Sequence, residues 1–355
     1  MFELEMLAAR EGDCLWIRYG KRTAPKQILV DAGRGSTYKN DLRARLLALP
    51  KNQRTFELFV ITHIDRDHIE GTLGLLEDPT LDVTFEEIWF NSYDHLKSAK
   101  LEAFGALQGE RLTTALLKRR ASWNKSWKGK AVALRGAALS KVKLPGGMTL
   151  TLLSPDRQKL RELIPSWEEE CKDAGLVPGS KARRRELKGL EEFGAIDVEA
   201  LAATKFDADT TRPNGTSIAM IAEYDGKKVL LGADAHVDRL LASLKTLAKG
   251  KKRVALDVIK VSHHGSDRNL SKELLEAIDC PEYLISTSGA YFKHPKAAAL
   301  ARILKFGGAK KTVAFNYRSK FTTIWDQAAL KAKYSYQAIY PDKRSNGTLL
   351  VQLSK

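Results

Sequence analysis

The chain has 355 residues, of which 43% are hydrophobic and 29% charged, with only 11 prolines. This composition is typical of a globular protein with a substantial core, and it excludes collagen-like, low-complexity and disordered chains. Lys and Arg number 59 against 43 Asp and Glu, and the resulting formal net charge of +16 favours phosphate-bearing partners such as nucleic acid.

Three features predict a protein of the reducing cytoplasm with no membrane partner. No apolar run approaches the roughly 20 residues that a membrane-spanning helix needs. The first residues, MFELEMLAAREGD, are acidic where a secretion signal has a basic end and an apolar stretch. Cys14, Cys171 and Cys280 lie far apart, a spacing that favours neither a disulfide framework nor a thiolate metal site.

Short strands that end in glycine or charged residues are predicted in the N-terminal third. FELEMLAA alternates apolar and polar residues, DCLWIRYG follows a turn, and QILVDAG and ELFVITH have the composition of buried strands. Helical spacing occurs over 39–48 and in IEGTLGLLE, which directly follows a polar turn. In α/β proteins, side chains at the ends of buried strands project into a crevice that holds the site.

The middle of the chain is predicted to be a basic, mainly helical insertion over 96–205 within a single domain, 1–355. Residues 96–135 contain ten Lys or Arg against only Glu102 and Glu110. A second polar helical stretch at about 157–203 follows the strand MTLTLLSP.

Two interpretations of the basic stretch remain open. It is either a nucleic-acid footprint or an amphipathic insert with core tryptophans and a solvated cationic face. The second is favoured because Trp123 and Trp127 stand at i and i+4, which would place both on one helix face. The possible nucleic-acid contacts are Arg119, Arg120, Trp123, Lys125 and Trp127.

The C-terminal half alternates strands and helices. Asp225-Gly226 predicts a hairpin between SIAMIAEY and KKVLLGADA. Helices are predicted at 236–248, 271–279 and 296–306, with the strands LDVIKVSHHGS and YLIST between them. This order predicts an α/β protein with two sheets in a sandwich flanked by helices.

The stretch VITHIDRDHIEG, residues 60–71, carries the clearest chemical signal. It places His63, Asp65, Asp67 and His68 within six positions after an apolar run. Two carboxylates this close repel each other unless a cation lies between them. A divalent metal is the cation that imidazole and carboxylate groups share, so the cluster predicts a metal site.

Three further strands end at potential ligands: Asp31, Asp234 and the pair His263-His264. Asp31 is expected to have a structural role in a turn. The spacing lets His63 and Asp65 bind one ion while Asp67 and His68 bind a second. With Asp234 as a bridge and His263 completing the second site, the set would generate an attacking hydroxide near neutral pH.

THIDRDHIEG resembles the H-x-H-x-D-H signature of the metallo-β-lactamase fold hydrolases, with Asp65 in place of the second histidine. Five segments resemble, in order, the ComEC-type subgroup, the hydrolase domain of DNA-uptake proteins: REGDCLWIRYG, QILVDAG, NGTSIAMIAEYDGKKVLLGADA, VIKVSHHGS and ISTSGAYFKHPKAAAL. The resemblance covers about 1–95 and 206–310. It implies an αββα sandwich with the metal site at one edge, and hydrolysis of esters, amides or phosphodiesters with one or two Zn²⁺ or Mn²⁺ ions.

Carried over to this chain, the resemblance implies the same six ligands: His63, Asp65, Asp67, His68, Asp234 and His263. Asp67 and His264 would also act in catalysis, and Asn214, His264 and His294 would face the substrate or support the ligands. The family commonly has a further histidine in the region where this chain reads RPNG. Asn214 occupies that region here. An amide is a weak ligand, so we expect a weak first site and a preference for manganese over zinc.

Three functions follow. The favoured one is a metal-dependent hydrolase of a phosphodiester in DNA or RNA. A second keeps the metal site but acts on a small ester, amide or peptide, with the insertion as a lid. A third is a metal-stabilised interaction subunit with protein partners in an operon-encoded complex.

Overall fold

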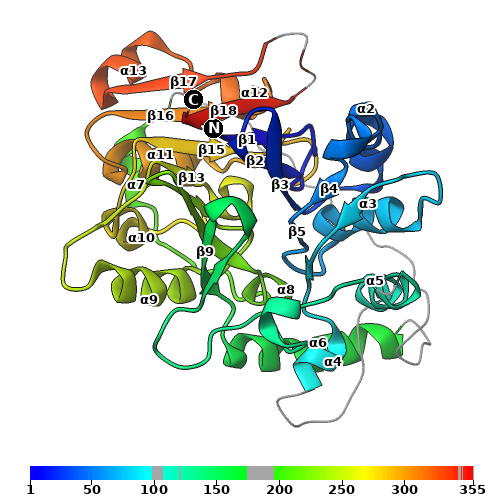
Figure 1. Cartoon of the computed structure of the whole chain (residues 1–355). Helices are drawn as coiled ribbons and strands as arrows, with labels where there is room; N and C mark the ends of the chain where they lie inside the picture. Colours follow the sequence, from blue (N-terminus) through cyan, green and yellow to red (C-terminus); the bar gives the residue numbers. More distant parts are fainter. Residues whose placement is uncertain (98–106, 120, 174–195, 343–344, 346, 355) are drawn as a thin grey trace.

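A computed structural model describes residues 1–97, 107–119, 121–173, 196–342, 345 and 347–354. Its strands form two large sheets between two layers of helices, with α2, α3 and α5 on one side and α7, α9 and α10 on the other (Figure 1). One hydrophobic cluster joins the facing sides of the sheets, and two others join each sheet to its own helices. The predicted αββα architecture is therefore confirmed.

The first sheet has six strands, antiparallel from β18 to β3 and parallel from β3 to β7. Because β1 pairs with β18, the two ends of the chain lie side by side (Figure 1). In spatial order the strands are β18 (Leu349–Ser354), β1 (Phe2–Met6), β2 (Leu15–Lys21), β3 (Ala24–Val30), β5 (Leu58–Val60) and β7 (Ile88–Trp89).

The second sheet has eight strands, parallel from β17 to β11 and antiparallel from β11 to β8. Its order is β17 (Tyr336–Ile339), β16 (Lys311–Phe315), β15 (Glu282–Ile285), β13 (Val258–Lys260), β11 (Lys227–Leu231), β10 (Ala219–Tyr224), β9 (Thr149–Ser154) and β8 (Lys141–Lys143). Two strand pairs stand apart: β12 (Val254–Ala255) with β14 (Ile278–Asp279), and β4 (Thr55–Phe56) with β6 (Thr84–Phe85).

The helices divide between the two outer faces according to the core clusters that they join. On the first sheet lie α2 (Arg43–Ala48), α3 (Arg66–Glu77), α4 (Tyr93–Lys97), α5 (Leu107–Lys118) and α6 (Arg157–Asp173). On the second lie α7 (Val198–Ala203), α9 (Val237–Ala248), α10 (Lys272–Glu276) and α11 (Ala297–Phe306). The remaining short helices are α1 (Gly35–Thr37), α8 (Arg212–Gly215), α12 (Lys320–Thr323) and α13 (Ala328–Tyr334).

The predicted hairpin is confirmed. Strands β10 and β11 pair with Tyr224 opposite Lys227, so Asp225 and Gly226 form a two-residue loop. Both have positive φ, 51° and 72°, which is the conformation that this kind of turn requires.

The range 96–205, predicted as a helical insertion, contains strands as well as helices. β8 and β9 lie within it and extend the second sheet beside β10. The prediction of one helix face carrying Trp123 and Trp127 is wrong. Asn124 between them is left-handed, with φ 49°, and Lys125–Trp127 is a single 3₁₀ turn, so the i, i+4 spacing does not act on an α-helix.

Among the described residues, the helices are too short or too polar to cross a lipid bilayer.

Candidate metal centre

The site lies where buried strands of both sheets end. Parallel strands β3 and β5 of the first sheet lead to Asp31 and His63. Parallel strands β11 and β13 of the second sheet lead to Asp234 and to His263-His264. Carboxyl ends of parallel strands share one edge of a sheet, so the facing sheets bring these segments together.

Helix α3 brings two more side chains to the site. Asp65 is its N-cap residue, so Asp67 and His68 fall within its first turn and are buried. The sequence placed the start of this helix three residues later, at Ile69. The earlier start matters because it fixes both side chains on a rigid element.

Asp234 stands at the centre, and one of its oxygens faces a first group of ligands. Oδ2 lies 3.6 Å from His263 Nε2 and 3.9 Å from His63 Nε2. His63 Nε2 is in turn 3.6 Å from Asp65 Oδ2, which belongs to a side chain that is 41% exposed. This group therefore opens toward solvent.

The other oxygen of Asp234 faces a second, deeper group. Oδ1 lies 3.6 Å from His68 Nε2 and 3.7 Å from His264 Nε2. His264 Nε2 is also 3.9 Å from Asp67 Oδ2. Asp67, His68 and His264 are all buried, and their ligand atoms lie within 4.8 Å of one another. Asp234 thus occupies the position of a bridge between two groups.

The donor atoms of this cage have the character of an ion site. Nε2 of His63, His68 and His264 and Oδ1 of Asp234 are buried and have no hydrogen-bond partner. Leaving buried polar atoms unpaired costs about 1–3 kcal/mol each, a cost that a bound cation removes. Imidazole nitrogens with carboxylate oxygens are a donor set for Zn²⁺ or Mn²⁺, so these residues fit a divalent metal.

Hydrogen bonds on the far side of each ring hold the histidines in place. His264 Nδ1 donates to the Ser286 carbonyl at 2.9 Å, and His68 Nδ1 donates to Asp31 Oδ2 at 2.7 Å. Because a carbonyl or carboxylate oxygen accepts, the proton of each neutral ring lies on Nδ1 and the lone pair of Nε2 faces the cage. This is the arrangement of metal-ligating histidines.

Charges within the cage shift several pKa values. Burial lowers the pKa of His68, but the carboxylates of Asp234 and Asp31 outweigh burial and raise it well above its usual value. Burial likewise lowers the pKa of His263, and Asp234 and Asp209 raise it to about 9. Burial raises the pKa of Asp234, while the surrounding histidines hold it well below its usual range. The cage thus favours positive charge, which protons and metal ions compete to supply.

His264 is placed differently from its prediction. The sequence assigned it a supporting role, yet its Nε2 points to Asp67 and Asp234 in the deeper group. His263, expected to complete that group, faces the first group instead.

Asn214 lies beside the first group. Its Nδ2 donates to Asp209 Oδ2 at 2.7 Å and lies 3.3 Å from His263 Nδ1. Asn214 therefore contacts a neighbour of His263, and its Oδ1 is buried without a hydrogen-bond partner.

Asp31 has a structural role, as expected, but within the site. Fully buried, with φ 54°, it accepts hydrogen bonds from Thr62 N at 2.8 Å and Thr62 Oγ1 at 2.7 Å, besides its bond to His68. His294 is buried beside the cage, with its ring centroid 5.4 Å from that of His263.

Two carboxylates of the site were missed from the sequence. Asp13 Oδ1 lies 3.5 Å from His264 Nδ1, and Asp209 Oδ2 lies 3.5 Å from His263 Nδ1. Asp13 stands just before a strand, in EGDC, and Asp209 in a polar stretch with no periodicity. Neither position carries a local signal that distinguishes it from an ordinary turn residue.

The predicted nucleic-acid contacts lie in different environments. Trp127 is buried against Trp89, with ring centroids 5.6 Å apart, so it is not available for base stacking. Trp123 is partly buried and donates to the Phe90 carbonyl. Lys125 and Arg119 are exposed, and Arg120 lies outside the described residues.

No protein-family model matches the chain, and no curated protein matches its sequence. Similar solved structures include a CmlA β-hydroxylase E377D mutant, with 11% identity over 99% of this chain and 54% of that one at a TM-score of 0.42. Zn²⁺-bound PqqB from Methylobacterium extorquens has 11% identity over 95% of this chain and 87% of that one, at a TM-score of 0.39. A diphosphatase of the PhnP family has 9% identity over 99% of this chain and 98% of that one, at a TM-score of 0.39.

This chain spans about half the length of CmlA. With TM-scores of 0.42 or less, these similarities carry no inference about activity, and the ComEC-type assignment stays a prediction.

Proposed function

We propose that the chain is a metal-dependent hydrolase of the metallo-β-lactamase fold that cleaves phosphodiester bonds in DNA or RNA. The observation that carries this proposal is the buried cage around Asp234, in which three imidazole Nε2 atoms point at one carboxylate without hydrogen-bond partners. His63, Asp65, His263 and Asp234 would hold one ion, and Asp67, His68, His264 and Asp234 the second. Metal ions in such a site lower the pKa of water and polarise a phosphoryl oxygen.

Asp67 is the residue best placed to handle a proton. Its carboxylate lies in the first turn of α3, and the residue is only 8% exposed. His264 Nε2 lies 3.9 Å from its Oδ2, so that oxygen can orient a water molecule and accept its proton.

A basic groove next to the cage supports a phosphate-bearing substrate. A cavity of about 440 Å³ is lined by four basic residues and two acidic ones: Arg10, Arg34, Lys39, Arg66, Glu11 and Glu70. Arg66 stands between Asp65 and Asp67 in the sequence, which places the groove at the start of α3. The excess of positive charge there attracts a polyanion.

Two exposed aromatic side chains support a nucleic acid in particular. Tyr291 and Phe292 are 37% and 41% exposed, and their ring centroids are 4.6 Å apart. Phe292 lies 6.0 Å from His294, the ring that contacts His263. Exposed aromatic rings beside a basic groove are the elements on which unpaired bases stack.

The proposal is tested by an activity screen with added Mn²⁺ or Zn²⁺. Single- and double-stranded DNA and RNA, a chromogenic phosphodiester and chromogenic carboxyl esters serve as substrates, with Asp67→Ala as the control. We expect phosphodiester hydrolysis that falls about 100-fold or more in the control, because a general base is lost. Hydrolysis of carboxyl esters alone would support the small-substrate function, and activity unchanged in Asp67→Ala would contradict an assignment to this site.

The nucleic-acid substrate has its own test. Tyr291→Ala/Phe292→Ala should raise KM for a single-stranded oligonucleotide about 10-fold, since stacking contributes about 1–3 kcal/mol per base. The chromogenic diester, which has no stacked base, should keep its KM. Leu350→Ala, at an exposed apolar position on β18, is the matched control. An equal KM change for both substrates would contradict stacking.

A further inference from the structure

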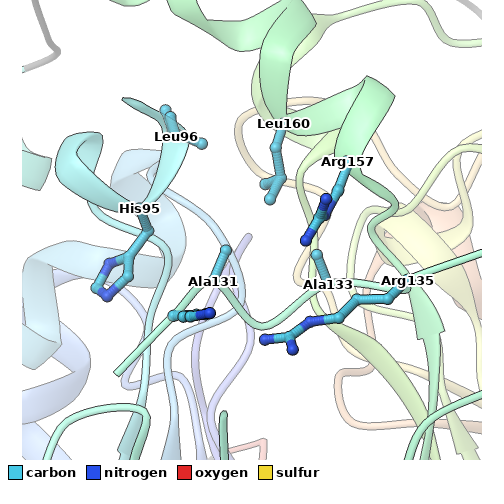
Figure 2. A pocket seen from close by; sticks show the side chains of 8 residues that line it. His95, Leu96, Ala131, Ala133, Arg135, Arg157 and Leu160 are labelled. Atoms are coloured by element: carbon cyan, nitrogen blue, oxygen red, sulfur yellow. The ribbon is translucent and has the colours of Figure 1, made fainter. Parts of the chain in front are cut away.

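A second cavity, distinct from the metal centre, lies between α4 and the first turn of α6. It has a volume of about 120 Å³ and is lined by His95, Leu96, Lys130, Ala131, Ala133, Arg135, Arg157 and Leu160. Figure 2 shows the side chains of Arg135 and Arg157 reaching into the same space from the 130–135 segment and from α6, with His95 on the α4 side.

The lining is cationic and has no acid in it. Lys130, Arg135 and Arg157 contribute three positive charges, and none of the three has an ion-pair partner among the residues that the structure describes. Several other arginines are paired, such as Arg239 with Asp156 at 3.0 Å. Three unpaired cations around one small cavity repel each other, and an anion between them removes that cost.

The backbone that forms the floor of this cavity is held on both sides. Asn91 Nδ2 donates to the Val132 carbonyl at 3.0 Å, and Asn91 Oδ1 accepts from Val132 N–H at 2.8 Å. Leu134 N–H donates to the Pro155 carbonyl at 2.9 Å. These bonds fix the backbone positions from which Lys130 and Arg135 extend, so ordering the backbone adds little to the cost of binding.

The cavity lies at the same edge of the fold as the metal centre. Asn91 follows β7, which is parallel to β5, the strand that leads to His63. Helix α6 also reaches the segment that follows Asp234, because Lys159, one position from the cavity residue Leu160, has its Nζ 3.1 Å from His236 Nδ1. His236 stands two residues after Asp234.

We propose that this cavity binds a phosphomonoester group, either the terminal phosphate of a nucleic-acid strand or a free phosphate. At neutral pH a monoester phosphate carries a charge of about −1.5 to −2, whereas a diester carries −1. The dianion therefore gains about twice the Coulomb attraction from the three cations. The binding of phosphate stands on the cavity alone, while its use to orient a strand end rests on the proposed function.

The first experiment measures binding of inorganic phosphate by isothermal titration, with sodium chloride at matched ionic strength as the reference. The variant Arg135→Gln/Arg157→Gln removes two cations from the cavity. Lys252→Gln/Arg253→Gln removes two exposed cations outside the cavity and is the charge-matched control. Both variants leave the metal ligands intact, so phosphate bound at the metal centre contributes equally to all three proteins.

We expect phosphate affinity to fall about 10-fold or more in the cavity variant, because each lost charge-assisted hydrogen bond is worth about that factor. The control variant should bind like the wild type. Circular dichroism in chloride checks that the cavity variant is folded, and Lys130→Gln provides a milder second variant. Equal phosphate affinity in wild type, both cavity variants and control would overturn the proposal.

Oligonucleotides with a 5′-phosphate, a 3′-phosphate or hydroxyl ends then distinguish the two sources. Tighter binding of one phosphorylated end, lost in the cavity variant, identifies a strand terminus as the occupant. If all three oligonucleotides bind equally well, while inorganic phosphate still binds the wild type more tightly than the cavity variant, the occupant is free phosphate. A chain that binds phosphate in this cavity but hydrolyses no phosphodiester would refute the proposed function and leave the cavity assignment intact.

Discussion

At the scale of single residues, the pair His263-His264 shows how two neighbours serve one site. Side chains of adjacent residues in a strand point to opposite faces, so the sequence favoured only one of them as a ligand. Both residues instead adopt left-handed backbone angles, φ 47° and 54°, an uncommon conformation for residues other than glycine. This turn directs both Nε2 atoms to Asp234, one to each oxygen.

The first prediction follows from that geometry. His263→Ala and His264→Ala should each remove at least one bound metal ion per chain, because each takes an Nε2 donor from one side of the cage. Metal content by atomic absorption of protein purified without chelator is the measurement. His95→Ala, a ring outside the cage that contacts Ser92 Oγ, should retain all of its metal. A His264→Ala protein with full occupancy would restore the supporting role predicted from the sequence.

The second prediction concerns Asn214 as a positioning residue. Asn214→Ala removes the donor to Asp209 Oδ2 and loosens the carboxylate near His263. Such supporting contacts are typically worth 10–100-fold in metal affinity, so we expect a metal Kd weaker by that factor, measured with a competing chelator. If Asn214 were a ligand itself, Asn214→Asp would strengthen metal binding; we expect it to weaken binding, because it places a second carboxylate against Asp209.

At the scale of elements, α3 sets the position of Asp67 and His68. Two glycines let its first turns approach the neighbouring loops. A Cβ at Gly71 would lie 1.9 Å from the Ala32 carbonyl oxygen, and one at Gly12 would lie 1.7 Å from the Asp67 carbonyl oxygen. Both contacts are with backbone, which cannot rotate away, so any side chain at these positions moves the helix.

The third prediction tests this close packing. Gly71→Ala should destabilise the protein by about 1–3 kcal/mol, the usual cost of overpacking, and should also weaken metal binding because His68 moves with the helix. Gly35→Ala is the matched control, since its Cβ would meet nothing within 4 Å. Urea unfolding gives the stability of both variants, and equal values for the two would mean that the loop shifts without cost.

At the scale of the whole molecule, a buried ion pair joins the two sheets beneath the metal centre. Lys260 ends β13 in the second sheet and is fully buried, and its Nζ contacts Asp13 Oδ2 from the segment before β2 in the first sheet. Burial raises the pKa of Asp13, but Lys260 and then His264 outweigh it and hold that pKa well below its usual range.

The fourth prediction is the pH dependence that follows. A carboxylate with a depressed folded pKa stabilises the fold above its unfolded pKa of about 3.9, and that contribution is lost as pH falls below this value. Lys260→Met should therefore reduce the loss of stability on acidification below about pH 4. At pH 7 it should cost about 3–5 kcal/mol, because a buried charge is left without its partner.

The measurement for this pair is urea unfolding at several pH values. Lys227→Met breaks a partly exposed pair with Asp257 and should change stability by no more than about 1 kcal/mol. If Lys260→Met loses as much stability on acidification as the wild type, the Lys260–Asp13 pair does not cause the loss of stability below about pH 4.

The sequence by itself determined those parts of the protein that depend on local pattern. Periodicity in QILV and ELFV predicted buried strands, Asp225-Gly226 predicted the hairpin, and two histidines and two acids within six positions predicted a turn that carries candidate metal ligands. These signals can be recognised in the sequence because each one depends on residues that lie close together in the chain.

The tertiary structure alone decided how those parts meet. Asp13 and Asp209 contact the two histidines from segments far away in the sequence, so no local pattern marks them. The start of α3 at Arg66 and the paired left-handed turn at His263-His264 depend on packing against both sheets. Trp123 and Trp127 do not share a helix face because the chain there bonds to Ile88 in β7. Contacts with distant strands outweigh the weak local preference for helix.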